Sequence, residues 1–404
     1  MMVSFPEPLR SPDFRLYWIA RFCAVLATMG MVVIIGYQVY DTARADYGMS
    51  IRDAAFMLGL LGLAQFVPLA LLTPVAGWVA DRYERRTVAR LANPIDMTVA
   101  LALGWFNLVD ALSLPILFLF AALHGVARVF VNPAMAAIAP NIVPPAQLPQ
   151  AIAMSSIAWQ AGSVAGPAIG GFLYAASPAL PYWSAAALML VAIVALTPIR
   201  RVVPPPIAGE SHPVRQMAEG ITYVRRHRFL LGAITLDLFA VLPGGAFAIL
   251  PVFAPDILHV GPEGLGLLRA APAVGAAVVA IWFAFLPLRH NVGIKMLLAV
   301  AAFGAMTLLF GLSRSMPLSL LLLALLGAFD MLSVYVRSSL VQLHTPDSMR
   351  GRVSAVSGLA ISASNELGEL QAGVMAALLG PTTAVVLGGG GAMGIAGLWS
   401  YLFP

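Results

Sequence analysis

A long apolar stretch near the start of the chain decides the fold class. Residues 16–40 read LYWIARFCAVLATMGMVVIIGYQVY, in which Arg21 is the single charged residue. A transmembrane helix needs about 20 consecutive apolar residues, whereas the apolar core of a cleavable signal peptide has about 7 to 15. We therefore interpret residues 16–40 as a first membrane span that is not cleaved.

The composition extends this interpretation to the whole chain. Of the 404 residues, 60% are hydrophobic and 10% are charged, and the mean hydropathy is +0.89. Soluble globular domains contain about 25% charged residues. Disordered, collagen-like, coiled-coil and disulfide-rich classes are excluded, and the single Cys23 can form no internal disulfide. The sequence is that of an integral membrane protein.

Apolar runs between charges, prolines and glycines predict an all-α integral membrane protein with twelve transmembrane helices. The expected spans are 16–40, 53–76, 88–109, 113–139, 148–175, 179–197, 229–253, 262–287, 291–312, 316–341, 349–377 and 380–403. They form an N-terminal six-helix bundle over 1–197 and a C-terminal six-helix bundle over 229–404. A cytoplasmic linker over 198–228 joins them, and residues 212–228 within it predict a short amphipathic helix at the membrane surface.

The positions of the basic residues predict the orientation. With the N-terminus inside, 16 of the 23 Lys and Arg residues flank the cytoplasmic ends of spans, three lie outside and four lie within spans. Cytoplasmic loops of membrane proteins accumulate Lys and Arg. We therefore expect both termini to be cytoplasmic, and we attribute the net charge of +5 to topology rather than to nucleic-acid binding.

The two halves of the chain resemble each other. Gly59-Leu60-Leu61 recurs as Gly266-Leu267-Leu268, and Pro144, Gly166 and Gly171 recur as Pro346, Gly368 and Gly373. The separation is close to half the chain length in both cases. Such parallel repeats are typical of membrane transporters.

The connection between the second and third spans carries a charged motif. Residues 77–86 read GWVADRYERR. They resemble the signature G-x-x-x-D-R-x-G-R-R of the major facilitator superfamily, with Glu84 where the family usually has glycine. The resemblance implies two pseudo-symmetric six-helix bundles and assigns a cytoplasmic latch between them to Gly77, Asp81, Arg82, Arg85 and Arg86. The alternative is a basic cytoplasmic loop with an incidental Asp81.

The fifth span carries a second motif, GSVAGPAIGG, over residues 162–171. It is similar to the element G-x-x-x-G-P-x-x-G-G of superfamily antiporters, most of which are exporters. Small residues at this spacing let helix backbones touch, and a proline bends the helix. The resemblance implies a helix pivot at Gly162, Gly166, Pro167, Gly170 and Gly171, with close packing alone as the alternative.

The resemblance continues over most of the chain, including VPPAQL at residues 143–148 and TPDSMRGR at residues 345–352. These stretches resemble the branch of the superfamily that contains the bacterial enterobactin exporter and related drug exporters. The resemblance implies a transporter of the bacterial inner (cytoplasmic) membrane that works by alternating access. It leaves the substrate open among a siderophore, a drug and an amphipathic metabolite.

Charged residues within the spans are the strongest functional signal that does not depend on the resemblance. Each costs about 2.5 to 3.5 kcal/mol at the centre of a membrane helix unless it is paired or hydrated. The spans enclose Arg21, Arg128, Arg269 and Arg337 together with Asp96, Asp237, Asp330, Glu366 and Glu369. Near-balance of charge predicts ion pairs with one carboxylate left to titrate. Arg21 and Arg337 lie close enough to the cytoplasmic end to snorkel instead. For Asp96 and Asp237 the alternative is to cap backbone or to pair with arginines of the latch.

We expect four membrane carboxylates to couple proton entry to substrate exit: Asp330, Glu366, Glu369 and Asp237. Glu366 and Glu369 lie one helical turn apart and repel each other when both are ionised, so one of them is expected to exchange protons. In the superfamily fold, spans 1, 4, 7 and 10 line the substrate cavity, which implies cavity positions for Arg128, Asp237 and Asp330. His124 lies four residues before Arg128 on one helix face and is a further candidate for the cavity lining. The alternatives are ion pairs that only hold helices together and a packing role for His124.

The favoured function is proton-coupled efflux of a small organic molecule. A proton-coupled importer or symporter is the alternative, because the latch motif is shared by both directions. A membrane-embedded enzyme or receptor is a different class, for which no nucleophile with a base and no metal cluster is readable. We expect no cofactor, with the proton gradient as energy source. The expected partners are the substrate and the lipid bilayer, with no nucleic acid, and we expect a monomer.

Overall fold

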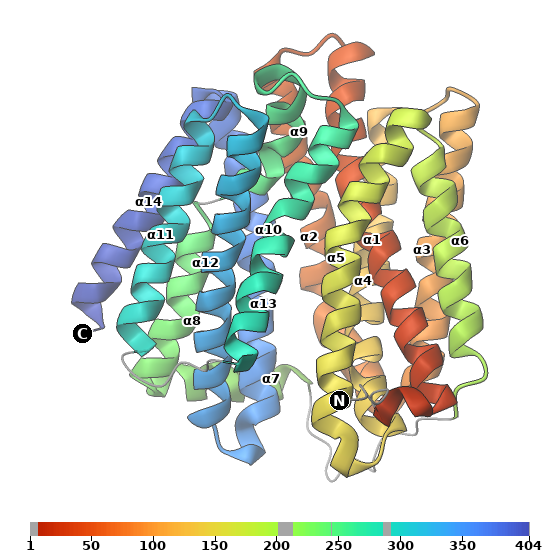
Figure 1. Cartoon of the computed structure of the whole chain (residues 1–404), viewed down its shortest axis with the longest axis vertical. Coiled ribbons are helices and arrows are strands. Elements are labelled where there is room, and N and C mark those ends of the chain that lie inside the picture. The colour runs from red at the N-terminus through yellow and green to blue at the C-terminus, as the bar shows by residue number, and fades with distance from the viewer. Residues whose placement is uncertain (1–6, 201–212, 244, 286–291, 404) are drawn as a thin grey trace, which may run out of the picture. The chain divides into compact units, whose positions relative to one another are not determined.

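The computed structural model describes residues 7–200, 213–243, 245–285 and 292–403, and within these residues it is helical with no β-strand (Figure 1). Apart from the seventh span, the described residues of each expected span correspond to one long helix. These are α1 (Pro12–Ala45), α2 (Ile51–Arg82), α3 (Arg85–Leu108), α4 (Leu114–Ile142), α5 (Leu148–Ala176), α6 (Leu180–Leu196), α10 (Pro262–Phe285), α11 (Val292–Leu312), α12 (Met316–Leu343), α13 (Asp347–Leu379) and α14 (Pro381–Leu402). The all-α architecture is confirmed.

Eight segments of the described chain are long and apolar enough to cross a membrane, with mean hydropathies from 1.4 to 2.1. The helix α6 is apolar as well but has only 17 residues. α3 carries Arg85, Arg86, Arg90 and Asp96, which lower its hydropathy. A multi-pass membrane protein follows from these helices.

The seventh expected span, 229–253, is not one continuous helix, and that prediction is wrong. The chain forms α8 (Arg228–Val241), then a 3-10 turn (Ala246–Ile249), α9 (Leu250–Val252) and the π-helical turn η4 (Phe253–Ile257). Pro243, Pro251 and Pro255 follow α8, and proline removes a backbone donor and clashes with the preceding turn. Residues 229–253 are mostly apolar, and this composition predicted a single span because it carries no information about where the helix breaks.

The charged motif at residues 77–86 was expected in a loop, which is a second error. α2 continues to Arg82 and α3 begins at Arg85, so only Tyr83 and Glu84 lie between the two helices. A basic residue in the last turn of α2 suits the negative end of the helix dipole. The motif is therefore the end of one helix and the start of the next.

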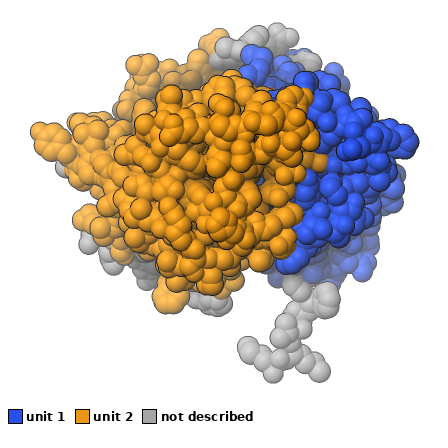
Figure 2. Space-filling model, turned by 90° about the horizontal axis from the view of Figure 1, so that it is seen from above, with its two compact units in different colours: residues 1–35, 67–210 blue, residues 36–66, 211–404 orange. Residues whose placement is uncertain are grey.

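The chain divides into two compact units, coloured separately in Figure 2. The first contains residues 1–35 and 67–210, and the second contains residues 36–66 and 211–404. In the first unit α3 packs against α4 and α6. In the second unit α11 packs against α12 and α14, and α10 packs against α12.

Glycines at repeated positions make equivalent contacts in the two units. A Cβ built on Gly166 of α5 would lie 2.6 Å from the carbonyl oxygen of Leu26 on α1. A Cβ on the corresponding Gly368 of α13 would lie 3.1 Å from the carbonyl oxygen of Leu242 at the end of α8. The fifth span thus packs on the first span as the eleventh packs on the seventh, as the sequence repeat predicts.

In the second unit, α2 and α13 meet through two glycines. A Cβ on Gly373 would lie 2.5 Å from the Cα atom of Gly59 and 2.6 Å from its backbone nitrogen. A Cβ on Gly59 would lie 3.1 Å from the Cα atom of Gly373. The two backbones are therefore in contact with no space for a side chain between them.

A short helix, α7 (Pro213–Arg226), lies within the expected linker and packs on α13 and α8, while its place at the membrane surface stays a prediction. Glu219 pairs with Arg352 of α13 at 2.9 Å, and a Cβ on Gly220 would lie 2.8 Å from the carbonyl oxygen of that arginine. Val224 is buried, whereas Ile221 is 41% exposed. The apolar face of α7 is thus partly covered by protein.

Candidate functional site

A buried cluster of charged side chains joins α8 and α12 in the second unit. Asp237 on α8 forms an ion pair with Arg337 on α12, and the two residues are 6% and 2% exposed. This burial argues against the snorkelling alternative for Arg337. Asp330 lies about two helical turns before Arg337, so the two residues share a face of α12. Among the described residues, Asp330 has no ion pair or hydrogen-bond partner.

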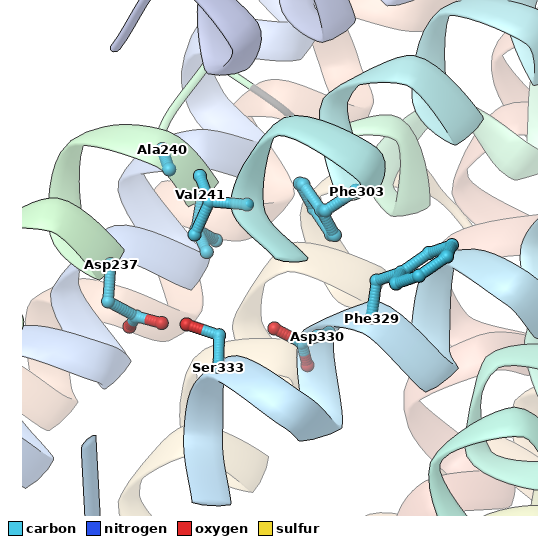
Figure 3. A pocket seen from close by; sticks show the side chains of 8 residues that line it. Asp237, Ala240, Val241, Phe303, Phe329, Asp330 and Ser333 are labelled. Atoms are coloured by element: carbon cyan, nitrogen blue, oxygen red, sulfur yellow. The ribbon is translucent and has the colours of Figure 1, made fainter. Parts of the chain in front are cut away.

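A small pocket between α8, α11 and α12 contains both carboxylates (Figure 3). Its polar lining is Asp237, Asp330 and Ser333, and the rest is Ala240, Val241, Val300, Phe303 and Phe329. The free space holds about one water molecule. The Asp237 carboxylate and the Ser333 hydroxyl point toward each other (Figure 3), and no described residue hydrogen-bonds that hydroxyl.

The charges of this pocket do not balance. Asp330 interacts electrostatically with both members of the Asp237–Arg337 ion pair, so two carboxylates stand against one guanidinium. When both carboxylates are ionised, one net negative charge remains in apolar surroundings, where charge is costly. One proton bound to either carboxylate removes that net charge. The pocket therefore has the composition of a proton-binding site.

A second ion pair joins α10 and α13. Arg269 lies 3.8 Å from Glu369, and its guanidinium lies 5.9 Å from the centre of the Phe247 ring. Glu366, one turn earlier on α13, also interacts electrostatically with Arg269. A Cβ on Gly62 of α2 would lie 2.8 Å from the Glu369 Cβ, so α2 covers this pair. Arg269 thus offsets the repulsion expected between the two glutamates.

The first unit holds a buried pair that the sequence did not reveal. His124 Nδ1 on α4 lies 2.5 Å from Asp96 Oδ1 on α3, and the two residues are 0% and 2% exposed. Asp96 therefore pairs with a histidine rather than with an arginine. His124 was expected to line the substrate cavity, and in this structure its side chain is buried against Asp96. Arg128 lies one turn further along α4.

Arginines of the charged motif tie the start of α3 to the ends of α4 and α6. Arg85 donates to the carbonyl oxygen of Ala137 at 3.2 Å, and Arg86 donates to that of Ile199. Glu84, which departs from the family pattern, pairs with Arg86 at 3.1 Å. The sequence shows that Glu84 replaces the usual glycine, but it does not show that Glu84 pairs with Arg86.

For the other residues of the expected latch, the structure gives no contact that tests the latch role. Arg82 is exposed at the end of α2. The surroundings of Gly77 and the side chain of Asp81 lie outside what the structure describes, as does the stretch 286–290 that corresponds to the motif in the second half. The latch role stays a prediction.

The expected pivot lies on α5, where it faces α1. A Cβ on Gly162 would lie 2.8 Å from Val25 Cγ1, and a Cβ on Gly170 would lie 3.4 Å from the Cα atom of Gly30. The five pivot residues, Gly162, Gly166, Pro167, Gly170 and Gly171, are all buried. Close packing at these positions is therefore observed, while pivoting stays a prediction.

Comparison with known proteins gives a consistent result. A family model described as Major Facilitator Superfamily matches residues 18–369. The chain is 28% identical to the Enterobactin exporter EntS of Citrobacter koseri over 385 residues, which are 94% of this chain and 89% of that protein. It is equally similar, at 28% over 385 residues and with the same coverage, to the Enterobactin exporter EntS of an Escherichia coli O127:H6 strain.

Solved structures with the same fold include a bacterial homologue of the human lysosomal transporter Spinster in an inward-facing, occupied conformation. Its TM-score is 0.74 at 16% identity, over 98% of each chain. A D-xylose-proton symporter gives a TM-score of 0.73 at 14% identity, also over 98% of each chain. At these identities the likeness concerns the fold alone, and it confirms the expected all-α transporter fold.

Proposed function

The chain belongs to the Major Facilitator Superfamily and is a membrane transporter, and from this premise we propose that it exports a small organic molecule in exchange for protons. The observation that carries the coupling is the pocket lined by Asp330 and by Asp237, the carboxylate that is paired with Arg337. A site with one surplus carboxylate takes up one proton without creating a net charge. Such a site suits a transporter that must move a proton through an apolar interior.

The proposed direction and substrate class rest on the relatives. Proteins named as enterobactin exporters cover 94% of this chain at 28% identity. Enterobactin is a siderophore, so a siderophore or a similar amphipathic metabolite is the first substrate class to test. Arg128 on α4 is the proposed contact for an anionic group of the substrate, because its charge lies within an otherwise apolar helix.

The proposed cycle uses the carboxylates of the second unit in turn. A proton from the outer side binds to Asp330 and neutralises the pocket, while Asp237 stays paired with Arg337. Substrate leaves on that side, and the proton leaves to the cytoplasm after the cavity has reopened inward. Glu366 and Glu369 both interact with Arg269, so this cluster also has two carboxylates and one guanidinium. A proton bound to either glutamate would remove the net negative charge of the cluster.

The proposed location is the bacterial inner membrane, with both termini in the cytoplasm. The distribution of basic residues supports this orientation, since 16 of the 23 Lys and Arg residues flank the cytoplasmic ends of spans. We further propose a monomer that uses the proton gradient as its energy source and takes the lipid bilayer and a small molecule as partners. No cofactor, metal or nucleic acid enters the proposal, nor does any enzymatic step.

The test uses inverted membrane vesicles from cells that produce the chain, with an imposed proton gradient and a dye that reports the pH of the lumen. A panel of catecholate siderophores, lipophilic drugs and organic anions is added. We expect a substrate to release protons from the lumen, and we expect Asp330→Asn to abolish this release. Asp110→Asn is the matched control, because this exposed aspartate lies between α3 and α4 with a positive φ that asparagine also adopts.

The result separates the alternatives. Proton release only from right-side-out vesicles would indicate an importer, and proton movement together with the substrate would indicate a symporter. If a folded Asp330→Asn protein kept full substrate-dependent proton release, Asp330 would not be the coupling group. A folded wild-type protein that moved none of the panel in either orientation would contradict the proposed substrate class.

A further inference from the structure

A histidine and an aspartate form a closed polar pair between helices of the first unit. His124 on α4 has no solvent exposure, and its Nδ1 atom lies 2.5 Å from Oδ1 of Asp96 on α3. The hydroxyl of Thr28 on α1 donates to the other carboxylate oxygen at 3.5 Å. Three helices therefore meet at one carboxylate.

Most buried residues near the pair in sequence are apolar. They include Val99, Ala100, Ala121 and Ala127, and the buried amide of Asn93 donates to the carbonyl oxygen of Ala89 in its own helix. No described residue hydrogen-bonds the Nε2 atom of His124, which is also buried. The Nε2 atom of His124 is therefore a buried polar atom without a hydrogen-bond partner among the described residues, which is energetically costly.

Other charged groups on the surrounding helices lie further along those helices. Within the first unit they are Arg128 on α4, Arg90, Arg86 and Arg85 on α3, and Arg21, Arg15 and Asp13 on α1. On α5 and α6 the titratable residues are Tyr174 and Tyr182. Arg21 bonds the carbonyl oxygen of Ser155, and Arg85 bonds that of Ala137. The nearest in sequence to His124 is Arg128, one turn away, whose positive charge opposes a further positive charge on the imidazole.

The proton count of the pair decides its charge. With Asp96 ionised and the imidazole neutral, Nδ1–H donates to the carboxylate and the pair carries one negative charge. A proton added to Nε2 converts the imidazole to imidazolium and makes the pair neutral overall. Because a buried unpaired charge is costly and a paired one is less so, the pair has two states that differ by one proton.

We infer that His124 and Asp96 form a second proton-binding site of the transporter, in the first unit and separate from the carboxylates of the second unit. The proton binds at Nε2 of His124, and Asp96 remains the counter-ion throughout. Asp96 also holds Thr28 of α1, so loss of the proton changes the charge at a contact among α1, α3 and α4. The inference rests on the proposed proton coupling for its role in transport, but not for the binding of the proton.

The first test concerns proton binding and does not need transport. In purified protein labelled with ¹⁵N-histidine, the signal of His124 is identified by its absence from His124→Gln. We expect this signal to change between neutral and protonated imidazole as the pH is lowered from about 9 to about 5, the range in which histidine titrates. A signal that stays constant over this range would overturn the inference, whatever the protein transports.

The second test separates proton binding from a structural hydrogen bond. The double variant His124→Gln with Asp96→Asn keeps an amide donor facing an amide oxygen but holds no titratable group. We expect it to lose proton-driven transport in vesicles by at least tenfold while it retains exchange of labelled for unlabelled substrate without a gradient. Thr98→Val is the matched control, because this exposed threonine of α3 bonds only the carbonyl oxygen of Pro94 in its own helix, and it should retain both activities.

The outcomes distinguish this inference from the proposed function. Full proton-driven transport by the double variant, with Asp330→Asn uncoupled, would leave the proposed function standing and remove the second site. Loss of both activities is tested further by Asp96→Glu, which keeps the carboxylate. Recovery of proton-driven transport by Asp96→Glu supports the inference, and failure to recover it in folded protein contradicts it.

Discussion

The hydroxyl of Tyr40 on α1 donates a hydrogen bond to Asp256 of η4, although 216 residues separate them in the chain. Both residues belong to the second unit. Tyr40 is 3% exposed, and Asp256 lies in the turn that follows the proline-rich break after α8. The end of α1 that is remote from the N-terminus is thus tied to the irregular part of the seventh span.

Replacing Tyr40 by phenylalanine should loosen this connection. Tyr40→Phe leaves the Asp256 carboxylate without its donor, which costs about 1 to 3 kcal/mol. Ala254, which is fully buried beside Asp256, serves as the reporter after Ala254→Cys in a Cys23→Ala background. We expect a maleimide to label this cysteine about tenfold faster in Tyr40→Phe. The exposed Tyr47→Phe is the control, and equal labelling rates in the two variants would contradict the prediction.

The Asp237 and Arg337 pair should behave as a unit in stability measurements. Asp237→Asn breaks the buried ion pair and leaves Asp330, which does not pair directly with Arg337, as the nearest counter-charge. Loss of one partner of a buried pair costs about 3 to 5 kcal/mol. The double variant with Arg337→Gln leaves neither charge, so it should cost less than Asp237→Asn alone. Thermal unfolding in detergent measures both. Arg215→Gln at the exposed pair with Glu219 should cost about 1 kcal/mol or less, and additive effects at the buried pair would refute the coupling.

Two glycines on α13 should respond in opposite ways to the same substitution. Gly373→Ala places a Cβ 2.5 Å from the Gly59 Cα atom, so the helices must separate. We expect a loss of about 1 to 3 kcal/mol, measured as a lower unfolding temperature. Gly358 lies on the same helix with nothing within 4 Å of its Cβ position, and alanine favours helix by about 1 kcal/mol. Gly358→Ala should therefore be neutral or stabilising. Similar losses in both variants would mean that the contact is not tight.

The Glu84 side chain should make a small contribution that depends on salt. Glu84→Gln removes the ion pair with Arg86 at 3.1 Å, whose side chains are 12% and 21% exposed. We expect a loss of about 1 kcal/mol or less at low ionic strength, and a smaller loss at about 1 M salt, where the screening length is about 3 Å. Glu7→Gln, at an exposed residue, is the control. A loss that grew with salt would show that the effect is not electrostatic.

The sequence predicts the helices well, because a backbone in lipid must satisfy its hydrogen bonds within each helix, and long apolar runs reveal where that happens. The glycine contacts of α5 were also predictable, since small residues recur at fixed spacing. Both errors in the helices concern their ends. The prolines after α8, beginning with Pro243, break the helix within a segment that is mostly apolar. The charged motif that begins at residue 77 predicted the end of the second helix, but α2 continues through it to Arg82.

Partners between helices were less accessible to prediction. The sequence indicated that membrane charges should pair, and Asp237 with Arg337 is such a pair. It did not indicate that Asp96 would meet His124 or that Tyr40 would meet Asp256, because the rotation and depth of each helix are set by packing against its neighbours. A residue's own helix determines the face on which it lies, but not what faces it.

The contact of Gly59 with Gly373 has a consequence for how relatives of this chain can diverge. When a larger residue appears at most packed positions, a neighbour can shrink to make room. Glycine has no smaller alternative, so neither member of this pair can compensate for a change in the other. Relatives that retain this helix contact should therefore carry glycine at both positions, even where the identity of the whole chain falls to 28%. Where one glycine is replaced, α2 and α13 must be further apart along their whole contact, and the other glycine is then free to vary.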